Sequence, residues 1–92
     1  MIKSFADKRT EMLFNRIPVR AFSAFERPAL KRLMLLHRAE NLQDLQAIRG
    51  NRLEALKDER AGQFSIRIND RWRICFRWME GDAYDAEIVD YH

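Results

Sequence analysis

The sequence contains little of what often identifies a protein class at first sight. Among its 92 residues there is a single cysteine, Cys75, which excludes an internal disulfide and favours a reducing compartment, the cytoplasm. Three glycines and two prolines leave no glycine-rich phosphate loop, and no cysteine–histidine spacing indicates a metal site. No charged start precedes a long apolar run, so we expect neither a signal peptide nor a membrane span.

The chain also has only a small excess of positive charge, +3 at pH 7. Lysine and arginine number 17 against 14 aspartates and glutamates, so the grouping of the cations matters more than their total. Hydrophobic residues make up 47% of the chain and charged residues 34%, as in ordinary globular proteins. At this length we expect one domain, residues 1–92, with a modest core.

Two alternating runs within residues 63–78 form the most regular pattern in the chain. One parity is apolar and contains Phe64, Ile66, Ile68, Trp72, Ile74, Phe76 and Trp78. The other parity is polar and mostly cationic and contains Gln63, Ser65, Arg67, Arg73, Cys75 and Arg77. Period-two alternation of this kind predicts two strands with one buried face and one outward face.

The connection between these strands sets their register. A loop of three residues, 69–71, pairs Ile66 with Ile74 and keeps both apolar sets on one face, whereas a two-residue loop exchanges the faces. The longer loop also places Arg67 opposite Arg73. Because like charges that face each other destabilise a sheet, we expect this face to bind an anion.

Residues 83–92 follow a predicted three-residue turn at 80–82 and are expected to close the sheet. The expected strand partners are Trp78–Tyr84, Arg77–Asp85, Phe76–Ala86, Cys75–Glu87, Ile74–Ile88 and Arg73–Val89. In this register Arg77 forms an ion pair, whereas Arg73 faces no carboxylate and stays available for a ligand. Tyr91 emerges on the cationic face.

Two helices are predicted before the sheet. Asp7 is a suitable N-cap for a short helix that includes residues 10–14. Ser23 and Glu26 have the spacing of a capping box, and Pro28 fits only the first turn of the second helix. The apolar side of that helix contains Leu30, Leu33, Met34, Leu36 and His37, the last expected to be structural.

Shorter elements complete the predicted fold. Residues 2–5 and 51–56 are expected to form short strands, and residues 42–48 a loop or a helical turn. Together the elements predict an α+β fold in which two N-terminal helices pack on a small, mainly antiparallel sheet.

Five stretches occur in the order and at the separations of a known bacterial family. They are MIKSF at 1–5, NRLEAL at 51–56, SIRIN at 65–69, WRICF at 72–76 and DYH at 90–92. In these stretches the chain resembles the HigB toxins, which belong to the RelE superfamily of type II toxin–antitoxin systems. The resemblance runs nearly end to end and is weakest at 16–26.

The resemblance implies a RelE/microbial-ribonuclease-like fold and an activity. The expected protein is a ribosome-dependent endoribonuclease, an mRNA interferase, which cleaves messenger RNA, inhibits translation and needs no metal or cofactor. Its expected partners are the ribosome with its mRNA and a HigA-type helix-turn-helix antitoxin, through which the complex binds operator DNA. No membrane partner is implied.

Five positions match the functional positions of the family, namely Lys57, Arg73, Asp90, Tyr91 and His92, and Glu54, Arg60 and Arg67 are added to them as further candidates. The predicted catalytic residues are Arg73, Asp90, Tyr91, His92 and Glu54, and the predicted RNA- or phosphate-binding residues are Lys57, Arg60 and Arg67. Glu54 stands where some HigB proteins have a histidine, which leaves the identity of the general base open.

The chemistry of metal-free RNA cleavage explains these residue types. The substrate's 2′-hydroxyl attacks the phosphate, so one group takes its proton, another protonates the departing 5′-oxygen, and a cation offsets the growing charge. Histidine has an unperturbed pKa near neutrality, which suits His92 to general acid or base work, and Asp90 and Glu54 are the carboxylates that can orient it or act as base. Arg73 supplies positive charge, and Tyr91 can stack on an unpaired base.

One alternative stays open on the sequence alone. A binding module of the same fold would dock RNA or a protein without cleaving anything. Its support is Glu54 in a histidine position and the presence of only two histidines, His37 and His92.

Overall fold

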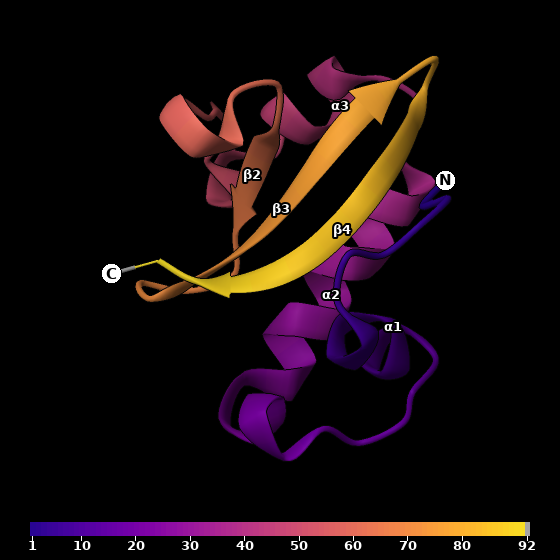
Figure 1. The fold of residues 1–92 in the computed structure, drawn as a ribbon, viewed down its shortest axis with the longest axis vertical. Coiled ribbons are helices and arrows are strands. Elements are labelled where there is room, and N and C mark those ends of the chain that lie inside the picture. Colours follow the sequence, from indigo (N-terminus) through magenta and orange to yellow (C-terminus); the bar gives the residue numbers. More distant parts are fainter. Residues whose placement is uncertain (92) are drawn as a thin grey trace.

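The computed structural model describes residues 1–91, so the predicted catalytic residue His92 lies outside the described residues. In chain order the elements are α1 (Lys8–Phe14), η1 (Arg20–Phe25), α2 (Glu26–Arg38), α3 (Leu42–Gln46), η2 (Arg49–Asn51), β1 (Glu54–Ala55), η3 (Asp58–Arg60), β2 (Phe64–Arg67), β3 (Trp72–Met79) and β4 (Asp82–Asp90) (Figure 1). Here α denotes an α-helix, η a 3₁₀ helix and β a strand.

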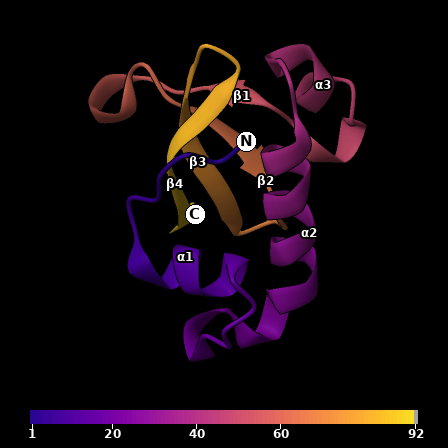
Figure 2. The same ribbon diagram turned by 90° about the vertical axis from the view of Figure 1, so that its right-hand side faces the viewer.

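Within residues 1–91 the four strands form one antiparallel sheet in the order β1-β2-β3-β4. Helices α1 and α2 both contact β4, and Figure 2 shows α2 running along the sheet with α1 lying near its lower end. The α+β fold predicted from the sequence is therefore confirmed.

The core lies between the helices and one face of the sheet. Its most deeply buried side chains include Leu13, Phe22, Leu33, Leu36, Ile66, Ile74, Phe76 and Ile88. The apolar parity of the alternating runs thus faces the helices, as predicted. Burying aliphatic and aromatic side chains of this size contributes about 1.5–3 kcal/mol each, which explains why this face sets the strand register.

The predicted register of β2 and β3 is confirmed. Ile66 pairs with Ile74 and Arg67 pairs with Arg73, as a three-residue connection requires. The Asn69 side chain helps to close this turn, because its Oδ1 accepts hydrogen bonds from two backbone N–H groups, those of Arg71 and Trp72.

The register of β3 and β4 is predicted correctly at one end only. The pairs Ile74–Ile88, Cys75–Glu87 and Arg73–Val89 are observed. Near the turn the partners are Met79–Asp82, Trp78–Ala83 and Arg77–Tyr84, so the connection has two residues. The predicted strand pairs Trp78–Tyr84, Arg77–Asp85 and Phe76–Ala86 are not observed, but the predicted ion pair between Arg77 and Asp85 is present at 3.6 Å. A β-bulge between Cys75 and Arg77 absorbs the difference, and Asp85 has a φ of 55° there.

The helical predictions hold at three of four points. The Asp7 side chain caps α1 by accepting the Arg9 backbone N–H, and Pro28 lies in the first turn of α2. His37 is structural, because its Nδ1 accepts the backbone N–H of Ile2 at 3.1 Å. The capping box at Ser23 is wrong: this residue lies inside η1, and its hydroxyl donates to the carbonyl of Arg20.

The short elements differ in extent from the prediction. Residues 42–48 contain helix α3, as expected. Residues 51–56 form a strand at Glu54–Ala55 alone, preceded by η2. Residues 2–5 make two isolated parallel bridges, Ile2–Ala83 and Phe5–Ala86, which extend the sheet beyond the edge of β4 instead of forming a full strand.

Candidate functional site

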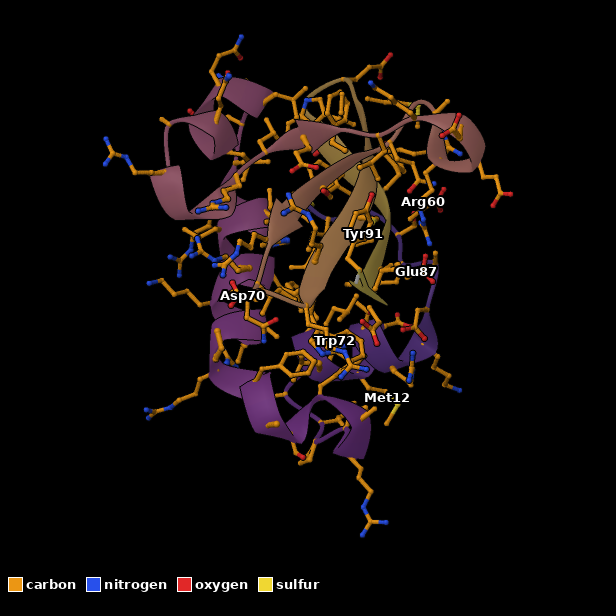
Figure 3. All side chains as sticks on the ribbon, turned by 90° about the vertical axis from the view of Figure 1, so that its left-hand side faces the viewer. Met12, Arg60, Asp70, Trp72, Glu87 and Tyr91 are labelled. Carbon is orange, nitrogen blue, oxygen red and sulfur yellow. The ribbon has the colours of Figure 1, made fainter. Side chains whose placement is uncertain are left out.

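An open cleft of about 500 Å³ lies between η3 and the end of β4. It is lined by Lys57, Asp58, Glu59, Arg60, Val89, Asp90 and Tyr91. Figure 3 shows Tyr91 lying over the sheet, with Arg60 and Glu87 to one side of it. Four of the predicted site residues, Lys57, Arg60, Asp90 and Tyr91, thus meet at one cleft although they come from segments 30 residues apart in the chain.

Arg73 lies beside this cleft but is not the free arginine that the sequence predicts. Its side chain is buried, and the residue is only 8% exposed. Nε donates to the Ser65 hydroxyl at 2.7 Å and Nη2 to the Arg52 carbonyl at 2.6 Å. The prediction considered only strand partners, whereas these acceptors include a loop carbonyl that the fold brings to the strand.

Glu54 and Tyr91 both lie near the Arg73 guanidinium. The Glu54 carboxylate is half exposed, and its Oε1 is 3.9 Å from Arg73 Nη1. The Tyr91 ring centroid is 5.9 Å from Arg73 Cζ, within cation–π distance. A carboxylate, a buried arginine and an aromatic ring are therefore brought together beside the cleft, although the sequence predicts that Arg73 faces no carboxylate.

The cations Lys57 and Arg60 enter the cleft from η3 and the residue before it. Lys57 is exposed, and no ion pair is seen for it in the part of the chain that the structure describes. Arg60 donates to the Gln63 side chain at 3.1 Å and to Glu87 Oε1 at 3.4 Å. Lys57 thus offers a single positive charge on a flexible side chain at the cleft, whereas Arg60 is held against strand β4 by its bond to Glu87.

Arg67 and Asp90 each form an ion pair with a residue outside the predicted site. Arg67 does not line the cleft and pairs with Asp70 across the hairpin turn. Asp90 accepts three hydrogen bonds from Arg71, at 2.7 to 3.0 Å. These bonds and the carboxylate's charge raise the pKa of Arg71 above its ordinary value, so the guanidinium stays charged at neutral pH.

Cys75 does not face solvent as the alternation predicts. The polar side of β3 is covered at this point, and Cys75, Ser65 and Arg73 are all buried. Burial raises the pKa of the Cys75 thiol, and the nearby Arg60 partly opposes that shift. The thiol is therefore neutral at physiological pH.

Four residues at the site were not singled out from the sequence. Ser65 and the Arg52 carbonyl hold Arg73, Glu87 holds Arg60, and Arg71 holds Asp90. The contact between Arg71 and Asp90 could have been found from the sequence, because the predicted pair Arg73–Val89 places residue 90 opposite residue 72, next to Arg71. The contact of the Arg52 carbonyl could not, because it comes from an irregular segment with a φ of 44°.

Residues 1–91 have neither a group of side chains placed to hold a metal ion nor a helix that could cross a membrane. In that range no group of three or more histidine, cysteine, aspartate and glutamate side chains is placed to hold a metal ion. Nor does any helix there have the length and apolar character to cross a membrane.

The arrangement is suited to a phosphodiester. Arg73 places positive charge beside an exposed carboxylate, Glu54, and Lys57 adds a second positive charge at the cleft. Tyr91, 41% exposed, presents an aromatic ring at the same place. These are the groups needed to hold an unpaired nucleotide and to activate a hydroxyl next to its phosphate.

Comparison with known sequences agrees with this chemistry. A family model described as a RelE-like toxin of the type II toxin–antitoxin system HigB matches residues 3–92. The chain is 33% identical to "Endoribonuclease HigB" of Proteus vulgaris over 93 residues, which cover 100% of both chains. It is 36% identical to "Toxin HigB-1" of Vibrio cholerae serotype O1 over 64 residues, which cover 70% of this chain and 67% of that protein.

Comparison with solved structures bears on the fold. A chain of the YoeB-YefM complex from Staphylococcus aureus matches with a TM-score of 0.54 and 17% sequence identity, covering 100% of this chain and 98% of that one. The architecture is thus RelE/YoeB-like, and the family predicted from the sequence is confirmed. This chain belongs to the HigB-like toxins, RelE-family toxins of type II toxin–antitoxin systems.

Proposed function

We propose that this toxin is an endoribonuclease that cleaves messenger RNA on the ribosome and thereby inhibits translation, with the open cleft as its active site. The full-length relative from Proteus vulgaris is named an endoribonuclease. The observation that carries the proposal is the meeting of Glu54, Arg73 and Tyr91 beside the cleft that Lys57 lines. Two cations, a carboxylate and an aromatic ring together are suited to binding single-stranded RNA.

In the proposed mechanism Glu54 acts as the general base. Its carboxylate takes the proton of the 2′-hydroxyl, the 2′-oxygen forms a bond to phosphorus, and the bond from phosphorus to the 5′-oxygen breaks. Glu54 is favoured over Asp90 because the Asp90 oxygens already accept three hydrogen bonds from Arg71, whereas Glu54 is half exposed. The leaving 5′-oxygen takes a proton from the general acid, a role for which His92, one of the positions that match the family, is the candidate.

Arg73 and Tyr91 have supporting roles in this mechanism. The guanidinium of Arg73 remains in place through its bonds to Ser65 and Arg52, so its charge is preorganised for the phosphate oxygens. Tyr91 stacks on the base next to the cleaved bond, and Lys57 contacts a neighbouring phosphate. Metal ions take no part in these steps.

The partners follow from the toxin class. A toxin of a type II system has an antitoxin as its partner. We propose further that the antitoxin is of the HigA helix-turn-helix type, and that the toxin–antitoxin complex binds operator DNA through it. The remaining proposed partners are the ribosome and its mRNA, and the proposed location is the cytoplasm.

Expression of the chain without an antitoxin tests the proposal. We expect wild-type protein to stop growth of a bacterial host and Glu54→Gln to allow it, with both proteins present at equal levels. Arg77→Ala is the matched control, because Arg77 pairs with Asp85 away from the cleft and should leave toxicity intact. Normal growth with folded wild-type protein present would favour the non-catalytic binding module instead.

A further inference from the structure

The end of the described chain carries two of the residues that line the cleft, Asp90 and Tyr91. Tyr91 follows the last residue of β4, belongs to no strand and is 41% exposed. A residue just beyond the end of a strand frays unless other contacts hold it. A site that includes Tyr91 therefore needs an anchor for the end of β4.

Arg71 contacts both residues. Its guanidinium donates to the Asp90 carboxylate from Nε to Oδ1 at 3.0 Å and to Oδ2 at 2.9 Å, and from Nη2 to Oδ2 at 2.7 Å. Its carbonyl oxygen accepts the backbone N–H of Tyr91 at 2.6 Å. The forked guanidinium fixes the orientation of the carboxylate as well as its distance. One residue thus holds two successive residues at the chain end.

The turn that carries Arg71 is itself restrained. Asn69 Oδ1 accepts the backbone N–H groups of Arg71 at 2.9 Å and of Trp72 at 2.8 Å. The Trp72 carbonyl accepts the N–H groups of Ile68 at 2.9 Å and Asn69 at 3.2 Å. A side chain that bonds the backbone of its own turn in this way limits the motion of that turn. Arg71 therefore connects the chain end to a fixed point of the sheet.

We propose that Arg71 is a positioning residue, which fixes the end of β4 so that Tyr91 lies beside Arg73 at the cleft. The inference rests on the proposed RNA-cleaving function and adds to it a residue outside the predicted site. The Tyr91 ring centroid lies 5.9 Å from Arg73 Cζ, near the outer limit for a cation–π contact. A small shift of the chain end therefore separates the two groups.

A direct contact between Arg71 and RNA is the competing explanation. Arg71 does not line the cleft, and its guanidinium is occupied by Asp90. The two roles differ in what they change. Loss of a phosphate contact weakens RNA binding and reduces its salt dependence, whereas loss of positioning lowers the rate of cleavage of RNA that is already bound.

The test compares Arg71→Gln with Arg77→Gln in the full chain. Arg77 is a matched control, because it also forms an exposed ion pair with an aspartate of β4, Asp85, toward the other end of that strand. Three quantities are measured: exchange of the Tyr91 backbone amide by NMR, the single-turnover cleavage rate at saturating toxin on ribosome-bound message, and the half-saturating toxin concentration. Asp90→Asn, measured by amide exchange alone, removes the same contact from the other side.

For Arg71→Gln we expect Tyr91 amide exchange to rise about tenfold as the chain end opens. The cleavage rate should fall by about 10- to 100-fold, the cost of misplacing a group at an active site. The half-saturating concentration and the melting temperature should stay as in the wild type. Arg77→Gln should change none of these, and Asp90→Asn should raise Tyr91 exchange as Arg71→Gln does.

Three results would overturn the proposal: unchanged Tyr91 exchange in Arg71→Gln, unchanged cleavage by that variant, or a loss confined to the half-saturating concentration. The last result would make Arg71 an RNA contact. Failure of the proposed function is seen separately. If the wild type cleaves no RNA while Arg71→Gln still raises Tyr91 exchange, the enzyme assignment fails and the anchoring of the chain end stands.

Discussion

Replacing Arg73 with alanine tests whether the arginine beside the cleft is part of the fold. The residue is 8% exposed and donates from Nε to the Ser65 hydroxyl at 2.7 Å and from Nη2 to the Arg52 carbonyl at 2.6 Å. The substitution removes both bonds and leaves two polar groups to be solvated at a covered site. We therefore expect the fold to be weakened, not merely the site.

The size of the effect follows from these contacts. A hydrogen bond with a charged partner contributes about 1.5–3 kcal/mol, and water that enters the vacated space offsets part of the loss. Two such bonds give an expected decrease of about 3 kcal/mol in the free energy of unfolding of Arg73→Ala. In a domain of this size about 1 kcal/mol moves the melting temperature by about 4–8 °C, so the expected decrease in melting temperature is about 12–24 °C.

Urea denaturation followed by tryptophan fluorescence, together with thermal melting, measures both quantities. Arg77→Ala is the control, because its ion pair with Asp85, at 3.6 Å, is exposed and contributes at most about 1 kcal/mol. If Arg73→Ala melts within a few degrees of the wild type, as Arg77→Ala should, the hydrogen bonds to Ser65 and Arg52 do not support the fold and the reasoning fails.

Three further predictions concern binding, pH and the last residue. Lys57→Ala should weaken RNA binding and reduce the slope of log Kd against log salt by about 0.7, the value for one phosphate contact on a single strand, measured by titration at several salt concentrations. Because burial raises the pKa of the Cys75 thiol above 9.0, the unfolded chain ionises first as pH rises. The wild type should therefore lose more unfolding free energy than Cys75→Ala above that pH in urea titrations; equal losses would contradict the shift. Deletion of His92 should leave the melting temperature nearly unchanged and lower cleavage by about 100-fold or more, and full cleavage by the shortened chain would remove His92 from the mechanism.

The sequence is sufficient to predict the strand pair at the centre of the fold. Alternation along 63–78 allows one register that keeps both apolar sets on one face, and the observed pairs Ile66–Ile74 and Arg67–Arg73 follow from it. Burial decides this register, and burial is visible in the residue pattern. The fold class is predictable for the same reason.

The β-bulge is not predictable from that pattern. It places Asp85 in the left-handed region, which aspartate tolerates but does not require. With the bulge, Ala83 and Ala86 are both fully buried although they are three residues apart, a spacing that strict alternation forbids. A short alanine gives little signal of which face it occupies, so the turn appears one residue longer than it is.

The sequence predicts which residues form the site better than it predicts the contacts that they make. Lys57, Arg60, Asp90 and Tyr91, all named from the sequence, line the same cleft. The burial of Arg73 depends on a loop carbonyl, and no pattern in the sequence indicates where that carbonyl lies. Side-chain pairs between strands are easier to find, since a correct register identifies the neighbours.

The chemical ends of the cleavage products test the central claim most directly. That claim is that the cleft cuts RNA through the substrate's own 2′-hydroxyl, with Glu54 as base. Purified wild-type chain, incubated with ribosome-bound message, should yield an upstream fragment with a 2′,3′-cyclic phosphate and a downstream fragment with a 5′-hydroxyl. Glu54→Gln should form the same ends about 100-fold more slowly. Fragments with a 3′-hydroxyl and a 5′-phosphate, or equal rates for the two proteins, would contradict the mechanism.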